Sequence, residues 1–220
     1  MPETPRALRR PHPTDHPGLT DGEPIGPHFV AQPVSATASV AYLAVGADLW
    51  RRRGTGDDPL GAGCYALAVA ANGIGGIAFH GPGDRVSRWL HDAALCATLG
   101  VQAARSPGVP SRGVAIGATV VPGMIAVACE PRLTNGVVAV LGGAALARDL
   151  ASARRGWRPG AMPVAVAVAA TAAGLALHRL ARPTSRAHLL RASRFGHAGW
   201  HVFSAVGLAA WGHMRNSPRP

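Results

Sequence analysis

The sequence predicts an all-α fold, a polytopic membrane protein built as a bundle of seven transmembrane helices, and three observations lead to this class. Apolar segments recur at short intervals from residue 33 to residue 213. Apolar residues make up 48% of the chain but aromatic residues only 5%, and small apolar residues favour close helix packing inside a bilayer. The segments at 60–80, 113–129 and 161–180 carry almost no charge on any face, whereas a soluble helix presents a charged face to water.

The expected elements follow in order along the chain. Residues 1–32 are rich in proline with almost no apolar runs, which predicts a flexible tail without the apolar core of a signal peptide. Residues 33–213 form the seven-helix transmembrane domain, and 214–220 form a short C-terminal tail. The expected spans are Val34–Leu49, Leu60–His80, Trp89–Ala104, Gly113–Cys129, Asn135–Ala147, Ala161–Leu180 and His197–Gly212.

Several of the expected segments are short for helices that cross a bilayer. A helix that crosses a bilayer needs about 20 residues, and several of these segments reach that length only if their ends extend into the loops. The fifth segment, Asn135–Ala147, is the weakest. A soluble helical bundle is the alternative, and the uncharged second, fourth and sixth segments argue against it.

The distribution of charge also favours a membrane protein. The formal net charge is +11, and all 22 basic residues counted in it are arginine. Nucleic-acid-binding proteins gather such charge on one face or tail, whereas these arginines lie in short clusters between apolar runs, as expected of loops beside lipid headgroups. We therefore expect no nucleic-acid partner and a multi-pass protein of a bacterial cell membrane. Arginine is balanced between the two faces, so the orientation stays open, as does the oligomeric state.

Four polar residues at the ends of apolar segments are the candidate functional residues. His80 ends the second segment, Asp92 lies near the start of the third, and His197 and His201 open the seventh. In a seven-span chain these ends lie on one face of the membrane. Ionisable residues at membrane depth are costly and tend to mark functional sites. We therefore expect the four side chains to converge near one bilayer surface.

The spacing of the histidines favours a metal site. Residues four apart lie on one face of a helix, so His197 and His201 can bind one ion together. With His80 they supply the three protein ligands of a catalytic zinc, which keeps its fourth position for water. Asp92 could accept the proton of that water or orient it. The weaker candidates near the same face are His91, His178 and Glu130.

Each of these residues also has a purely structural interpretation. An HxxxH pair on a helix is often only two interfacial histidines. His80 beside Gly81 could mark a plain helix end. Asp92 in a first helical turn favours the positive end of the helix dipole. The joint occurrence of all four on one face is what favours a site.

Three motifs resemble the alkaline ceramidase group: Phe79–His80, Asp92, and GHAGWHVFSA from Gly196 to Ala205. That group belongs to a superfamily of seven-span membrane hydrolases that includes the progestin and adipoQ receptors and lipid-remodelling proteins of GPI anchors. The resemblance implies a zinc ion held by His80, His197 and His201, with Asp92 assisting the water. The implied activity is hydrolysis of an amide bond in a membrane lipid such as ceramide.

One position departs from the family pattern. The family places a serine one turn before the first histidine, where this chain has Gly76. Ser204 is a candidate replacement hydroxyl, one turn beyond His201. The missing serine motivates an alternative function, a non-catalytic zinc-containing receptor or lipid-binding protein on the same scaffold. The N-terminal segment has no acidic pattern that would imply a calcium site.

Overall fold

The computed structural model describes residues 16–105, 112–154, 161–181 and 195–216, and within these ranges all regular structure is helical. The prediction of an all-helical fold is thus confirmed for these residues. Residues 1–15 and 217–220 of the expected tails, and the arginines between 182 and 194, lie outside them. The helices are α1 (Pro33–Ala38), α2 (Val40–Arg51), α3 (Pro59–His80), α4 (Arg85–Ala104), α5 (Arg112–Cys129), α6 (Thr134–Arg154), α7 (Ala161–Ala181) and α9 (Phe195–Asn216), with short 3-10 turns at Pro17–Thr20 and Pro131–Leu133.

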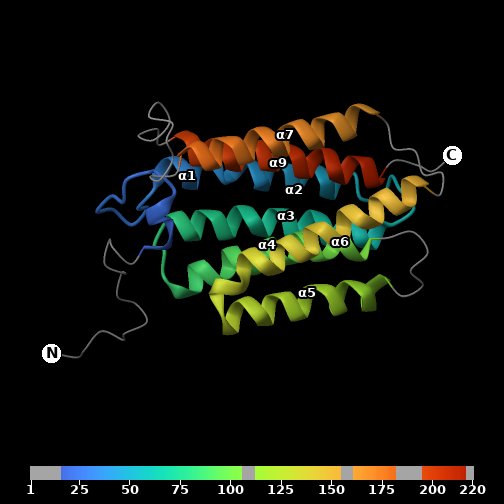
Figure 1. Ribbon diagram of the computed structural model, residues 1–220, viewed down its shortest axis with the longest axis horizontal. Helices are drawn as coiled ribbons and strands as arrows, with labels where there is room; N and C mark the ends of the chain where they lie inside the picture. The colour runs from blue at the N-terminus through green and yellow to red at the C-terminus, as the bar shows by residue number, and fades with distance from the viewer. Residues whose placement is uncertain (1–15, 106–111, 155–160, 182–194, 217–220) are drawn as a thin grey trace.

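The long helices lie side by side in one bundle (Figure 1). Helix α7 packs on α9, α9 on α2, α2 on α3, and α3 on α4, which in turn contacts α5 and α6. The apolar core lies among α2, α3, α4 and α9. Its buried members are Tyr42, Leu49, Tyr65, Ala66, Val69, Val101 and Ala205.

Glycines in the second half of α3 allow its neighbours to approach closely. A Cβ atom on Gly75 would lie 2.7 Å from the Cα of His91 in α4, and one on Gly73 would lie 2.7 Å from Cγ of Leu43 in α2. Beside them, Asn72 donates a hydrogen bond of 2.6 Å from Nδ2 to Oγ1 of Thr98. Small residues therefore bring α3 against both neighbours, which is how helices associate in a bilayer.

Among the residues that the structure describes, three helical stretches are long and apolar enough to cross a membrane: Pro59–His80, Pro131–Arg154 and Met162–Leu180. Only 17% of the most apolar window of Pro131–Arg154, and 11% of that of Met162–Leu180, is buried inside the protein. Their exposed surfaces are apolar, as at Val140 and Val168, and such a surface is stable in lipid rather than in water. Helices α4 and α9 are less apolar than α3 because they carry the polar candidate residues. That the chain crosses the membrane seven times stays a prediction.

The helix boundaries differ from the expected ones in several places, and α4 begins at Arg85, four residues before the expected Trp89. The first segment is two helices, because the chain bends at Ser39 between α1 and α2. The fifth segment, expected to be the weakest, continues to Arg154 as α6. The seventh continues to Asn216, beyond the expected boundary at residue 213, because Met214 and Asn216 are buried against the bundle.

Residues 16–32 pack over the end of the bundle, an arrangement that their composition did not predict. The backbone N–H of Gln32 donates to the carbonyl of His80 at 2.8 Å, and that of Ala31 donates to the carbonyl of Gly81 at 3.2 Å. The side chain of Gln32 is fully buried. Hydrogen bonds to the end of α3 therefore hold this segment, whose large apolar side chains Leu19, Phe29 and Val30 stay exposed.

Candidate metal centre

Two helices supply the three predicted ligands. His80 is the last residue of α3, which ends there because Gly81 leaves the helical conformation. His197 and His201 lie one turn apart at the start of α9. The end of α3 and the start of α9 meet at the same end of the bundle (Figure 1), so residues far apart in the sequence come together.

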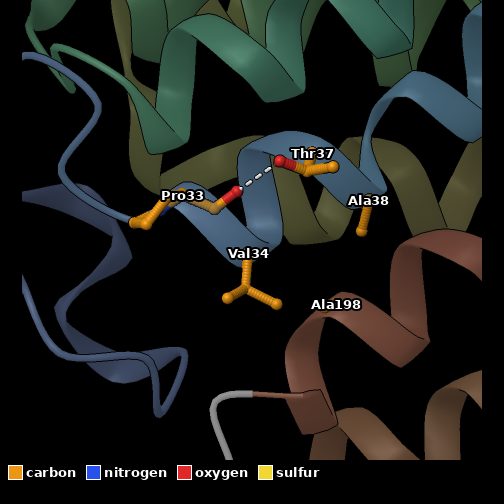
Figure 2. Close-up of a pocket in the computed structure, with 5 residues that line it drawn as sticks. All are labelled: Pro33, Val34, Thr37, Ala38 and Ala198. Atoms are coloured by element: carbon orange, nitrogen blue, oxygen red, sulfur yellow. Dashed lines mark hydrogen bonds between the residues drawn. The ribbon is translucent and has the colours of Figure 1, made fainter.

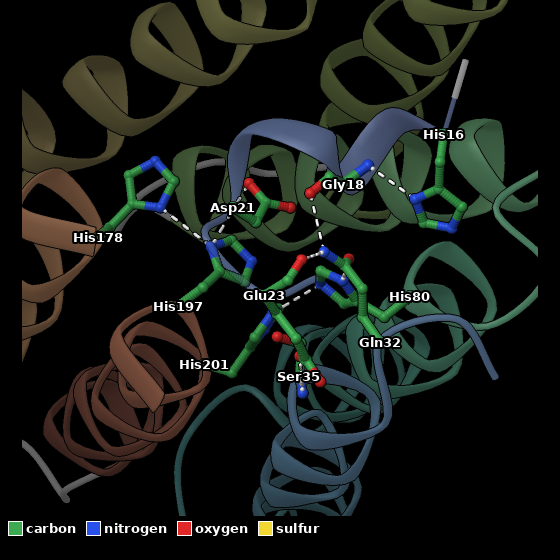
Figure 3. A network of polar contacts seen from close by, with 10 residues as sticks. All are labelled: His16, Gly18, Asp21, Glu23, Gln32, Ser35, His80, His178, His197 and His201. Carbon is green, nitrogen blue, oxygen red and sulfur yellow. Dashed lines mark hydrogen bonds and ion pairs between the residues drawn. The ribbon is translucent and has the colours of Figure 1, made fainter. Parts of the chain in front are cut away.

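The three imidazole rings form one compact cluster (Figure 3). One nitrogen from each of His80, His197 and His201 lies within 4.8 Å of the others, and Nε2 of His80 lies 3.0 Å from Nε2 of His201. The three residues are 0%, 6% and 3% exposed. A buried cluster of this kind could hold a metal ion.

The cluster fits a metal ion in its spacing and its chemistry. Nitrogen ligands of a tetrahedral zinc lie about 2.0–2.1 Å from the ion and hence roughly 3.3 Å from one another, close to the His80–His201 separation. Three neutral imidazoles provide the donor set, and a fourth position remains for water or substrate. The same donors also suit copper, iron and nickel, so the geometry alone does not select the metal.

Polar groups of the N-terminal segment and of α7 surround the cluster. Nδ1 of His80 lies 2.7 Å from Oε1 of Gln32. Nδ1 of His197 lies 3.2 Å from Nδ1 of His178 and 3.6 Å from Oδ1 of Asp21. Such partners orient ligating histidines in metal sites. Sequence reasoning named His178 only as a weak candidate and missed Asp21 and Gln32, because isolated polar residues in a proline-rich stretch carry no periodic signal.

His16 lies at the edge of this group of polar residues. Its Nδ1 accepts a hydrogen bond of 3.1 Å from the N–H of Gly18. Burial lowers the pKa of His16, against the opposing effect of a backbone hydrogen bond to Gly81. The turn between α3 and α4 leaves room for this ring because residue 83 is glycine, with φ of 60°, and a Cβ there would lie 2.1 Å from Nε2 of His16. The imidazole therefore helps fix the end of α3.

Asp92 does not belong to the ligand cluster. Its Oδ1 lies 3.0 Å from Nδ1 of His91, its Oδ2 accepts a hydrogen bond of 2.8 Å from Thr134 in α6, and Arg88 lies 3.7 Å away. The ring of His91 stacks on Phe79, with centroids 4.6 Å apart, and is likewise not one of the clustered ligands. The role of Asp92 as the residue that assists the water stays a prediction.

Ser39 occupies the space beside Gly76. A Cβ atom on Gly76 would lie 2.5 Å from Oγ of Ser39 and 3.9 Å from Cε1 of His201. Ser39 is fully buried and donates to the carbonyl of Ser35 at 3.0 Å. Ser204, considered above as a replacement hydroxyl, instead lies 2.5 Å from the hydroxyl of Tyr42. The hydroxyl nearest to position 76 thus comes from the bend between α1 and α2.

Substitution of Gly76 with alanine is expected to destabilise the protein by about 1–3 kcal/mol, the usual cost of overpacking a core. The added methyl group would collide with Ser39. Thermal unfolding in detergent would measure the loss. In a Ser39→Gly background the same substitution should cost less, because its collision partner is gone. An equal cost in both backgrounds would contradict this explanation.

An open groove lies between α1 and the start of α9 (Figure 2). It has a volume of about 430 Å³ and is lined by Pro33, Val34, Thr37 and Ala38 of α1 and by Ala198 of α9. The hydroxyl of Thr37 donates to the carbonyl of Pro33 at 2.7 Å, so the lining presents mainly carbon. Ala198 follows His197 directly, and the groove therefore provides an apolar surface next to the metal ligands.

Fold and site together define a class: a helical protein with membrane-capable helices and a buried histidine cluster that could bind a metal ion. No family model, characterised protein or solved structure matches this chain. A functional assignment therefore rests on the motifs and the geometry of the site.

Proposed function

We propose that this chain is a seven-span integral membrane hydrolase that uses zinc to cleave an amide bond in a membrane lipid, as alkaline ceramidases do. The observation that carries the proposal is the buried cluster of His80, His197 and His201 at one end of a bundle with membrane-capable helices. The resemblance of the three motifs to the alkaline ceramidase group supports the reaction type. Ionisable side chains at membrane depth are costly and tend to mark functional sites, which also supports the proposal.

The residues have distinct roles in this proposal. The three histidines would hold the ion, which when bound polarises a substrate carbonyl and activates water at neutral pH. Their burial excludes bulk water, which strengthens electrostatic interactions inside the site. The groove between α1 and α9 would take an acyl chain, because its carbon-rich lining begins beside His197.

In this proposal Asp92 accepts the proton of the water. Nδ1 of His91 lies 3.0 Å from Oδ1 of Asp92, and the ring of Phe79 lies between His91 and the cluster, with its centroid 4.6 Å from that of His91 and 5.0 Å from that of His80. Because a phenyl ring carries no proton, a proton released at the site would reach the carboxylate of Asp92 through a water molecule that bridges the two. Thr134 holds the second oxygen of that carboxylate in place.

Metal content and lipid hydrolysis, measured on the same detergent-purified sample, test the proposal. We expect about one zinc ion per chain, as in other three-histidine sites, and release of a fatty acid from ceramide or a related lipid amide. A chelator should stop the release, and added zinc should restore it. Zinc-loaded protein that cleaves neither lipid amides nor lipid esters would overturn the hydrolase assignment.

The alternative function is a non-catalytic zinc-containing receptor or lipid-binding protein. Two observations favour it: glycine stands at position 76, and the carboxylate of Asp92 contacts Thr134 and His91 instead of the ligand cluster. This alternative predicts bound zinc without turnover.

Substitution of Asp92 with asparagine separates the two functions. If Asp92 transfers the proton, turnover should fall by about 10²–10⁴-fold, while zinc content stays unchanged because Asp92 is not a clustered ligand. The amide of asparagine can still accept from Thr134, so the fold should be kept. Unchanged turnover would show that Asp92 has no part in the chemistry.

A further inference from the structure

The side-chain amide of Gln32 makes three hydrogen bonds, two through its nitrogen Nε2 and one through its oxygen Oε1. Its Nε2 donates to the carbonyl of Gly18 at 2.8 Å and to the carbonyl of Glu23 at 2.8 Å. Its Oε1 lies 2.7 Å from Nδ1 of His80. The residue is fully buried. Figure 3 shows this amide between the N-terminal segment and the histidine cluster.

These bonds determine the tautomer of His80. Carbonyl oxygens only accept, so the two carbonyls of Gly18 and Glu23 fix the amide nitrogen on their side and leave Oε1 facing His80. Because Oε1 also only accepts, Nδ1 of His80 carries the hydrogen. A neutral imidazole with its hydrogen on Nδ1 has its lone pair on Nε2, which is the atom that faces His201.

Two acidic residues anchor the same segment, residues 16–32, which we call the strap. The carboxylate of Glu23 accepts hydrogen bonds of 2.8 Å from the N–H groups of Val34 and of Ser35. These N–H groups belong to the first turn of α1, where they have no partner within the helix. Asp21 lies 3.6 Å from Nδ1 of His197. The strap thus contacts two of the three clustered histidines directly.

We propose that Gln32 is a positioning residue of the metal centre, and that metal binding and closure of the strap over the centre are coupled. Gln32 holds Nε2 of His80 ready for the ion and, through the same amide, holds the strap closed. Coupling between two sites is reciprocal, so bound metal also stabilises the closed strap. The inference rests on the metal-binding part of the proposed function, but not on hydrolysis.

Two substitutions separate the bond to His80 from the bonds to the strap. Gln32→Glu keeps an acceptor for Nδ1 of His80 but cannot donate to the carbonyls of Gly18 and Glu23. Gln32→Met has a similar size and can make none of the three bonds. Gln102, which is equally buried in the last turn of α4, provides the matched control as Gln102→Met.

Zinc affinity is read by competition with a chromogenic chelator. Gln32→Met should weaken zinc binding by about 10–100-fold, the usual effect of losing such a partner. Gln32→Glu keeps the acceptor for His80 but loosens the strap, so it should bind zinc less tightly than the unaltered protein and more tightly than Gln32→Met. Gln102→Met should leave the affinity unchanged. If Gln32→Met binds zinc as tightly as the unaltered protein, or if Gln32→Glu binds as weakly as Gln32→Met, the positioning role is wrong.

Strap closure is read by hydrogen exchange at the amides of Ala31, Gln32, Val34 and Ser35, all of which are bonded in the closed strap. Both Gln32 variants should exchange faster there, and zinc should slow exchange in the unaltered protein. Equal exchange with and without zinc would overturn the coupling. Absence of zinc binding in the unaltered protein would overturn the metal centre itself, whereas normal zinc binding by Gln32→Met overturns the present inference alone.

Discussion

Replacement of both His197 and His201 with alanine is expected to reduce bound zinc from about one ion per chain to none. The double substitution leaves His80 as the only clustered ligand, and a single imidazole cannot hold a structural or catalytic zinc against water and buffer. The two residues lie one turn apart in α9, and alanine has the highest helix propensity, so the substitutions should leave α9 helical. Elemental analysis of purified protein, normalised to chain concentration, measures the effect.

His213 provides the control for this experiment. It lies on the same helix, near the opposite end, and its Nε2 is 3.1 Å from Asp48. His213→Ala should keep its zinc, because the substitution does not touch the cluster. Zinc retained by the His197→Ala, His201→Ala protein would place the ion elsewhere and remove the basis of the proposed function.

The meeting of the three histidines could be predicted from the sequence because it follows from topology. His80 ends one apolar segment and His197 begins another. Because successive segments cross the bilayer in opposite directions, those two ends come to the same side. The spacing of four between His197 and His201 then fixes their common helix face. Neither step depends on the conformation of a loop, and the structure brings the three side chains together.

The surroundings of the cluster could not be predicted in the same way. The strap has almost no apolar periodicity, so nothing in its pattern marks Gln32 or Asp21. The side chain of Asp92 in α4 points toward Thr134 of α6, to which it is hydrogen-bonded. The sequence does not specify how these two helices are aligned along the bundle, so this contact could not be predicted. The bend at Ser39, which fills the space beside Gly76, likewise lies inside a segment that was expected to be continuous.

A second group of buried charges lies at the other end of the bundle from the histidines. Arg215 forms an ion pair with Asp149, and Trp211 donates a hydrogen bond of 2.7 Å to the same carboxylate. Arg105 bonds Asn216 at 2.6 Å and Asp58 at 3.3 Å. These contacts join the end of α4, the end of α6, the end of α9 and the start of α3. They involve no clustered histidine, so we expect their role to be structural.

Substitution of Asp149 with alanine is therefore expected to lower the free energy of unfolding by about 3–5 kcal/mol, the cost of leaving a buried partner without its counter-charge. The side chain of Arg215 is only 5% exposed. Unfolding in detergent, followed by circular dichroism, measures the loss. Arg51→Gln is the control, since Arg51 is 75% exposed in its pair with Asp48 and such pairs contribute about 0–1 kcal/mol.

A double substitution distinguishes charge from shape at this position. If the cost of Asp149→Ala comes from the uncompensated charge of Arg215, then Asp149→Leu combined with Arg215→Met should be more stable than Asp149→Leu alone, because well-packed apolar residues can replace a buried ion pair at little cost. Zinc content should be the same in the folded fraction of all these proteins, since the pair lies at the end of the bundle away from the cluster. A double variant no more stable than the single one would show that the ion pair contributes through its packing and not through its charges.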